Sequence, residues 1–272
     1  MPGKLLKKIL EEFKQSDEES LSVIDQGINN ILEIPEILSL KRLTRLTLSH
    51  NKLTILPAQI AELINLEQLN LSNNQIEELP TAISSFQNLK ILKLCFNKIS
   101  VLPRGFGAFP VLEILDLTSN NLNEKSLSNN FFELKTLRAL YLGDNFFEYL
   151  PNEIGNLINL QILVLRTNEL VEIPNEIDNL KNLKELHLQS NRLQLLPPKI
   201  AKLDLLGPKS ILKLENNFWI EGISNALEIG LSHLVDYLQS ESYERLYEKE
   251  KSIVQKSQVP PKSERYKRIY KK

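Results

Sequence analysis

One repeated pattern constrains the fold of this chain more than any other feature of its sequence. The pattern LxxLxLxxNxLxxLPxxIxxLxx occurs seven times with a spacing of 23 residues, except for one step of 25 residues. A unit this short cannot bury its apolar residues alone, so successive units must stack and share one continuous core. The copies begin at Leu43, Leu66, Leu89, Leu112, Leu137, Leu160 and Leu183.

Each position in the pattern has a physical role. The two leucines of LxL point to the same face of a short strand, into the core. The asparagine follows the strand, where its amide can both donate and accept hydrogen bonds in a turn. The Leu-Pro step then fixes φ where the chain crosses to the opposite side. These features predict an α/β fold: a leucine-rich-repeat solenoid with a concave parallel β-sheet, an N-terminal helical cap and a C-terminal helix.

The two ends of the chain are expected to cover the ends of this repeat stack. Leu5, Leu6, Ile9, Leu10 and Phe13 recur at helical spacing before the repeats, and a leucine stripe at helical spacing follows the repeats. The last residues have too little apolar content to fold. The predicted segments are a capping helix at 1–20, a solenoid at 21–219 with a degenerate first repeat, seven regular repeats and a terminal cap repeat, a C-terminal helix at 220–250, and a disordered basic tail at 251–272.

The fourth repeat departs from the pattern. It lacks the proline and contains NLNEKSLSNNFF, which makes it two residues longer than the others. Loops tolerate insertions well, so we expect a bulge on the convex side. A dedicated binding loop is the alternative.

Charge and cysteine content limit the possible partners. The net charge is −1, but residues 251–272 contain eight Lys or Arg and one Glu, so the repeats are mildly acidic. Phosphate binding needs a basic surface, which argues against a nucleic-acid partner. The single cysteine, Cys95, permits no internal disulfide, which indicates a reducing compartment. With no apolar run of about 18 residues, we expect a cytoplasmic protein that does not insert into membranes.

Catalytic, metal-binding and cofactor-binding signals are missing from the sequence. Three histidines and one cysteine are too few and too scattered for a zinc site. Cys95 and His187 are both expected on the concave face, but four strand spacings separate them, roughly 19 Å. That exceeds the reach of a hydrogen bond between a nucleophile and its base. We therefore predict a protein that is not an enzyme, with no cofactor and no metal.

The outward positions of the strands have no role in the core, so their identities are informative. Repeats one and two present small polar groups there, whereas later repeats present aromatic and charged groups. Tyrosine and arginine dominate the energetics of protein interfaces, so these positions predict a partner-binding site. The alternative is a solvated face on which Arg166 merely pairs with Asp144 or Asp116. The candidate residues are Phe96, Asp116, Tyr141, Asp144, Arg166 and His187.

Several segments resemble a more specific family than the repeat consensus. They are LPRGFG at 102–107, NFFELKTLRALYLGDNFFEYLP at 130–151, LKELHLQSNRLQLLPP at 183–198 and ENNFW at 215–219. These segments are similar to the Ras suppressor proteins, small leucine-rich-repeat adaptors of integrin adhesions. The resemblance covers roughly residues 20–250, although Phe218 departs from the Asn-Pro-Trp that is common at such caps.

The resemblance implies a partner and a location. The implied partner is the last LIM domain of PINCH, a zinc-stabilised module that links integrin-linked kinase and parvin to adhesions. It also implies a role in cell adhesion at focal adhesions, in Ras signalling and in cell spreading. Within the family, the concave aspartate, tyrosine and arginine match Asp116, Tyr141 and Arg166 here. We expect a monomeric adaptor whose function is protein–protein interaction.

Two other classes of function stay open. Other repeats of the LPxxI type regulate partners by docking a small GTPase or the catalytic subunit of a phosphatase. The second class is an enzyme, which a chain of seven repeats without an appended domain makes improbable. The sequence does not distinguish the direction of an effect on Ras signalling.

Overall fold

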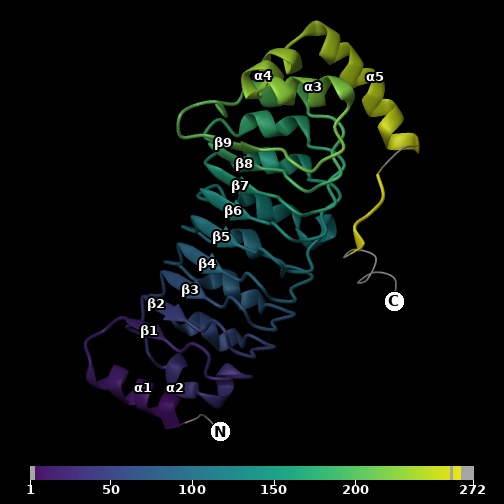
Figure 1. Cartoon of the computed structure of the whole chain (residues 1–272). Coiled ribbons are helices and arrows are strands. Elements are labelled where there is room, and N and C mark those ends of the chain that lie inside the picture. Colours follow the sequence, from purple (N-terminus) through teal and green to yellow (C-terminus); the bar gives the residue numbers. More distant parts are fainter. Residues whose placement is uncertain (1–3, 258–259, 265–272) are drawn as a thin grey trace. The chain divides into compact units, whose positions relative to one another are not determined.

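The computed structural model describes residues 4–257 and 260–264, and the chain divides into two compact units, residues 1–141 and 142–272. Within each unit, short strands alternate with turns and short helices (Figure 1). The first unit contains β1 (Ser20–Ser22), β2 (Arg45–Thr47), β3 (Gln68–Asn70), β4 (Ile91–Lys93), β5 (Ile114–Asp116) and β6 (Ala139–Tyr141). The second contains β7 (Ile162–Val164), β8 (Glu185–His187) and β9 (Ile211–Lys213).

The strands of each unit pair in parallel and in chain order, with leucine opposite leucine. In the first unit Leu46 lies opposite Leu69, and the same register continues to β6. In the second unit Leu163 lies opposite Leu186, which lies opposite Leu212. Most of these leucines are buried, as the LxL spacing predicts. The leucine-rich-repeat fold is therefore confirmed.

The asparagine of each repeat forms a ladder of hydrogen bonds to the backbone. The Asn120 amide nitrogen donates to the carbonyl oxygens of Leu94 and Leu117, both at 3.0 Å. Its amide oxygen accepts from the Ile99 N–H at 3.0 Å. Asn168 makes the equivalent bonds within the second unit. Each asparagine thus satisfies backbone groups of its own repeat and of a neighbour, as its position in the pattern predicted.

The residue before each asparagine has a left-handed backbone, which the repeat pattern did not reveal. Its φ lies between 54° and 58° in every repeat, and none of these residues is glycine. Side chains other than glycine adopt this conformation at a cost of about 1–2 kcal/mol. The turn ends the strand and leads directly into the buried asparagine. The residues are His50, Asn73, Phe96, Ser119, Asp144, Thr167, Ser190 and Asn216, and Asp25 has the same conformation before Gln26 in the degenerate first repeat.

The side of each repeat opposite its strand is formed by short helical turns. In most repeats the proline of the repeat pattern precedes the turn, and a buried isoleucine or phenylalanine from the turn enters the core. The 3₁₀ turns are η1 (Ile31–Glu33), η2 (Ala58–Glu62), η3 (Thr81–Ser85), η4 (Phe106–Ala108), η5 (Glu124–Ser126), η6 (Asn129–Glu133), η7 (Asn152–Asn156), η8 (Asn175–Asn179) and η9 (Pro198–Lys202).

The longer fourth repeat contains the additional turn η5. Asn123 caps this turn by accepting from the Lys125 N–H at 2.9 Å. The buried Ser126 hydroxyl donates to the Ser100 carbonyl oxygen at 2.6 Å. The extra residues therefore pack on the preceding repeat, and both the bulge and the dedicated binding loop stay predictions.

The N-terminal cap is the amphipathic helix α1 (Lys4–Gln15), followed by the short helix α2 (Pro35–Leu38). Leu6, Leu10 and Phe13 of α1 are buried. The Arg42 guanidinium lies 4.6 Å from the centre of the Phe13 ring and donates to the Ser16 carbonyl oxygen at 2.7 Å. These contacts attach α1 to the repeats of the first unit.

The C-terminal region contains three helices, whereas the sequence predicted one helix at 220–250. They are α3 (Glu221–Ile229), α4 (Leu231–Leu238) and α5 (Glu241–Ser257). Gly230, with a φ of 148°, separates α3 from α4. Tyr243 of α5 is buried, and its hydroxyl donates to the Leu196 carbonyl oxygen at 2.6 Å and accepts from the Leu196 N–H at 3.1 Å. Of the helices in the described residues, none is both long and apolar enough to cross a membrane.

The structure also differs from the predicted disordered tail at 251–272. Residues 251–257 continue α5, and residues 260–264 contact the repeats of the second unit. These contacts join charged and polar groups, so apolar content did not reveal them. Residues 265–272 of the predicted tail lie outside the described residues.

Candidate protein-binding surface

The outer strand face is the side of the strands that carries the residues alternating with the core leucines. In the first unit, Lys93, Asp116 and Tyr141 occupy the same register on β4, β5 and β6. The Asp116 carboxylate is oriented by its own strand, because it accepts from the Thr118 N–H at 3.0 Å. Asp116 and Tyr141 are both partly exposed. The oriented Asp116 carboxylate therefore lies on the strand adjacent to the one that carries Tyr141.

Phe96 lies outside the strand, in the left-handed turn that follows β4. Its φ is 56°, and its N–H donates to the Thr118 carbonyl oxygen at 2.9 Å. The residue is 53% exposed. A bulky side chain in this conformation is unusual. The equivalent residue of every repeat has the same conformation, so it belongs to the repeat turn and does not by itself mark Phe96 as functional.

Cys95 also lies on the outer strand face of the first unit. Its thiol donates to the Ser72 hydroxyl oxygen at 3.0 Å. Burial raises the pKa of the Cys95 thiol above its ordinary value, with a further contribution from the negative charge of Asp116. The thiolate is the nucleophilic form, so these surroundings disfavour a reactive cysteine.

In the second unit, Arg166 and Asp144 form an ion pair at 3.5 Å between Nη2 and Oδ2. Their backbones are also joined, because the Asp144 N–H donates to the Arg166 carbonyl oxygen at 2.9 Å. Gly143 leaves space for the arginine. A Cβ atom at position 143 would lie 3.2 Å from Arg166 Cγ and 3.5 Å from Nε. The missing side chain thus lets Arg166 lie across the neighbouring strand end.

His187 lies on β8, and its side chain is half-buried. Burial lowers the pKa of the imidazole below its ordinary value, and the positive charges of Lys213 and Arg166 act in the same direction, while Glu185 opposes them. Its Nε2 atom and Oε1 of Gln189 have no hydrogen-bond partner among the described residues. The Gln189 Oε1 atom can only accept a hydrogen bond, whereas His187 Nε2 accepts or donates according to the imidazole tautomer.

The structure brings together some of the sequence-predicted residues within each unit. In the first unit Asp116 and Tyr141 are neighbours in register, and in the second Asp144 and Arg166 are paired. The ion pair between Arg166 and Asp144 was also expected if this face is simply exposed to solvent. The role of these residues in binding therefore stays a prediction. The sequence did not reveal the contribution of Gly143. A glycine at an outward strand position does not show what it makes room for until the position of Arg166 is known.

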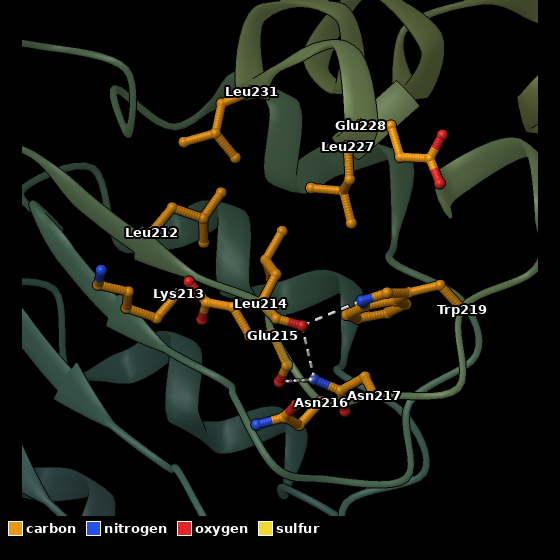
Figure 2. Close-up of a pocket in the computed structure, with 10 residues that line it drawn as sticks. All are labelled: Leu212, Lys213, Leu214, Glu215, Asn216, Asn217, Trp219, Leu227, Glu228 and Leu231. Carbon is orange, nitrogen blue, oxygen red and sulfur yellow. Dashed lines mark hydrogen bonds between the residues drawn. The ribbon is translucent and has the colours of Figure 1, made fainter. Parts of the chain in front are cut away.

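A separate hollow of about 520 Å³ lies in the second unit between β9 and the helices α3 and α4 (Figure 2). Trp219 borders it and donates from its indole N–H to the Leu214 carbonyl oxygen at 3.0 Å. The lining combines apolar side chains with two carboxylates, one lysine ammonium and two amides, and it contains no hydroxyl, thiol or imidazole side chain. The lining residues are Leu212, Lys213, Leu214, Glu215, Asn216, Asn217, Trp219, Leu227, Glu228 and Leu231.

Metal ligands are not grouped anywhere in the described part of the chain. No cluster of three or more His, Cys, Asp or Glu side chains there is arranged to hold a metal ion. The outer strand face carries carboxylate, guanidinium, imidazole and aromatic side chains, which are the groups that protein interfaces commonly use.

Comparison with known proteins agrees with this description. The family described as "Leucine-rich repeat region" matches residues 96–228, and "Leucine Rich repeats (2 copies)" matches residues 41–85. Among curated proteins, human Ras suppressor protein 1 is 62% identical over 260 residues, which is 96% of this chain and 93% of that protein. The cattle protein of the same name is 65% identical over the same shares of each chain.

The chain belongs to the Ras suppressor protein 1 family. The resemblance noted in its sequence is therefore confirmed. Family membership and the leucine-rich repeats together support a protein-interaction adaptor rather than a catalytic protein.

Solved structures place this Ras suppressor relative among other leucine-rich-repeat proteins. A leucine-rich-repeat protein of Leptospira interrogans is 32% identical with a TM-score of 0.60, covering 80% of this chain and 65% of its own. The Arabidopsis receptor kinase HAESA, in complex with the peptide hormone IDA and the co-receptor SERK1, is 27% identical with a TM-score of 0.63. That match covers 75% of this chain and 35% of the receptor chain.

Proposed function

We propose that this chain is a non-catalytic adaptor that binds the last LIM domain of PINCH through its outer strand face. In this role it links the complex of integrin-linked kinase, PINCH and parvin to cell adhesion and Ras signalling, in the cytoplasm at integrin adhesions. The observation that carries the proposal is the oriented Asp116 carboxylate beside Tyr141, in a family whose members are Ras suppressor proteins.

The rigidity of the strands supports a protein ligand. In the seven regular repeats each strand is held by buried leucines on one side, and each strand end is held by a buried asparagine. Side chains on such a frame lose little further freedom when a partner binds, so less of the interaction energy is spent on ordering. Arg166 is already positioned by Asp144 and by the space above Gly143. Its five N–H donors can engage Asp144 and a partner carbonyl or carboxylate together.

The chemistry of the outer strand face also suits a small folded module. Tyrosine and arginine are the residue types that most often dominate interface energies, and both are partly or fully exposed here. Phe96 adds exposed aromatic surface, and His187 adds a polar edge in the second unit. A LIM domain is compact and rigid because zinc holds it together, so it can meet such a surface with little rearrangement.

Titration calorimetry of the full chain with the purified last LIM domain of PINCH tests the proposal. We expect saturable binding of one LIM domain per chain, and no binding of another LIM domain of the same protein. GTP-loaded Ras and a phosphatase catalytic subunit form the comparison arms. Binding of either comparison protein with no LIM binding would replace the adaptor function by regulation through direct docking. Binding of none of the four would reject the outer strand face as the site for these partners.

A further inference from the structure

The C-terminal segment 260–264 is held against the second unit by polar contacts far from it in sequence. The Pro260 carbonyl oxygen accepts from Nε of Arg192 at 2.7 Å. The Lys262 ammonium donates to Oε1 of Glu148 at 2.5 Å. The Ser263 N–H donates to the Glu169 carboxylate at 3.1 Å, and its hydroxyl donates to the same carboxylate. Figure 1 shows this segment beside the repeats of the second unit, beyond the end of α5.

Glu148, Glu169 and Arg192 form what we call the charged cradle. They come from three successive repeats, just after the ladder asparagines. Arg192 lies 3.8 Å from the Glu169 carboxylate and 3.7 Å from the Glu148 carboxylate. Glu169 is only 2% exposed and Arg192 only 6%. Charged groups are rarely buried this deeply unless they are paired and hydrogen-bonded.

The segment 260–264 provides a positive charge and a hydrogen-bond acceptor that complement the charged cradle. The cradle has two carboxylates and one guanidinium, so it holds a net negative charge that the lysine ammonium of the segment offsets. The guanidinium has five donors, and the carbonyl of Pro260 accepts from two of its nitrogens. The Pro260-Pro261 pair restricts the free segment to extended conformations, which lowers the entropy lost on docking.

We propose that the charged cradle is a peptide-binding site whose ligand is this chain's own segment 260–264, and that added negative charge on Ser263 releases the segment. The site recognises three features in order: a proline carbonyl, a lysine ammonium, and a serine that donates from both N–H and O–H. It is distinct from the outer strand face, because none of its residues lies on a strand.

Ser263 is the sensitive point because its hydroxyl donates to an anion. Transfer of the terminal phosphoryl group of a nucleoside triphosphate to Ser263 Oγ would form an O–P bond, release the hydroxyl proton and leave the nucleoside diphosphate. The donor would then be replaced by a dianion beside the Glu169 carboxylate, which repels it. The side of Ser263 that faces away from the cradle is exposed, so the residue is accessible for modification.

The test measures hydrogen exchange of the Ser263 amide in the full chain by nuclear magnetic resonance. In the unmodified protein we expect this amide to be protected, because it donates to a buried carboxylate. Ser263→Asp should speed its exchange about tenfold or more, since a hydrogen bond to a charged group stabilises by about that factor. Ser263→Ala removes only the hydroxyl and should have a smaller effect. Lys262→Met, which removes the contact to Glu148, should also speed exchange.

Ser232→Asp is the matched control, because it adds the same charge at an exposed position of α4. It should leave Ser263 exchange unchanged. The tested side chains lie on the segment and not in the repeats, so these variants should keep the melting temperature of the parent. Exchange at the rate of an unstructured peptide in the parent protein would overturn the proposal. So would Ser263→Asp exchanging no faster than Ser263→Ala.

Discussion

The ladder asparagines and the side chains on the outer strand face come from the same repeats but use their polar atoms differently. Asn120 is 1% exposed, and both ends of its amide bond to the backbone. Arg166 is exposed and has one paired carboxylate, Asp144, in the structure. Removing the Asn120 side chain leaves buried backbone groups without hydrogen-bond partners. The Arg166 side chain lies at the surface, so removing it leaves no buried group unpaired. Under the proposed function, the asparagine ladder would serve stability and the outer strand face would serve recognition.

The largest expected effect is on partner binding. Tyr141→Ala and Arg166→Ala should each weaken binding of the LIM domain roughly 30- to 1000-fold, about 2–4 kcal/mol, if these residues are the central anchors of the interface. Both should change the free energy of unfolding by less than about 0.5 kcal/mol. Titration calorimetry and thermal melts of each variant measure the two quantities. Thr47→Ala, on the outer strand face of β2, is the control that should affect neither.

An equally large loss of stability in these variants would contradict the comparison. It would mean that the side chains contribute to the core. Normal binding by both variants would move the interface to another surface, such as the helical turns opposite the strands or the C-terminal helices.

The next largest effect is on stability at the asparagine ladder. Asn120→Ala should lower the free energy of unfolding by about 1–3 kcal/mol, because it leaves backbone groups buried and unpaired. Asn88→Ala is the matched control: Asn88 is exposed and donates to the Ile64 carbonyl oxygen at 3.1 Å. Denaturant unfolding compares the two variants. Equal losses would show that burial of the asparagine does not determine its contribution.

A smaller effect is expected at the left-handed turns. Thr167 has a φ of 54°, which is unfavourable for a β-branched residue, whereas Asn73 has the same conformation at the equivalent position with a φ of 55°. Asparagine tolerates this region, so Thr167→Asn should stabilise by about 0.5–1 kcal/mol. The reverse change, Asn73→Thr, should destabilise by a similar amount. Changes of the same sign in both variants would argue against backbone strain as the cause.

The smallest effect concerns pH. Burial keeps the pKa of His187 below its ordinary value, so the folded chain resists protonation where the unfolded chain accepts it. The contribution to stability is present above the unfolded pKa of about 6.5 and is lost as pH falls below it. His187→Gln should therefore reduce the fall in melting temperature between pH 7 and pH 5. His233→Gln, at an exposed position of α4, controls for the loss of one imidazole. An unchanged pH profile in His187→Gln would contradict this effect.

The repeat pattern was sufficient to predict the strands, the buried leucines and the asparagine ladder. These features depend on residues that recur at fixed short distances, so their physics is local and is repeated in every copy. Asp116 and Tyr141, both among the predicted outward residues, occupy equivalent positions in successive repeats, and such positions become neighbours in a parallel sheet. The left-handed turns were missed, since residues as different as Phe96, Thr167 and Asp144 adopt them.

By itself the sequence determined the fold and the family, because periodic leucines permit only stacked strands and because whole segments match the Ras suppressor proteins. Only the tertiary structure decided how Arg166 lies over Gly143, why one predicted helix is three, and where residues 260–264 are held. Lys262 and Glu148 are 114 residues apart in the chain, and no periodicity relates them. Contacts of this kind depend on charges that meet only after the repeats have stacked, so local pattern carries no information about them.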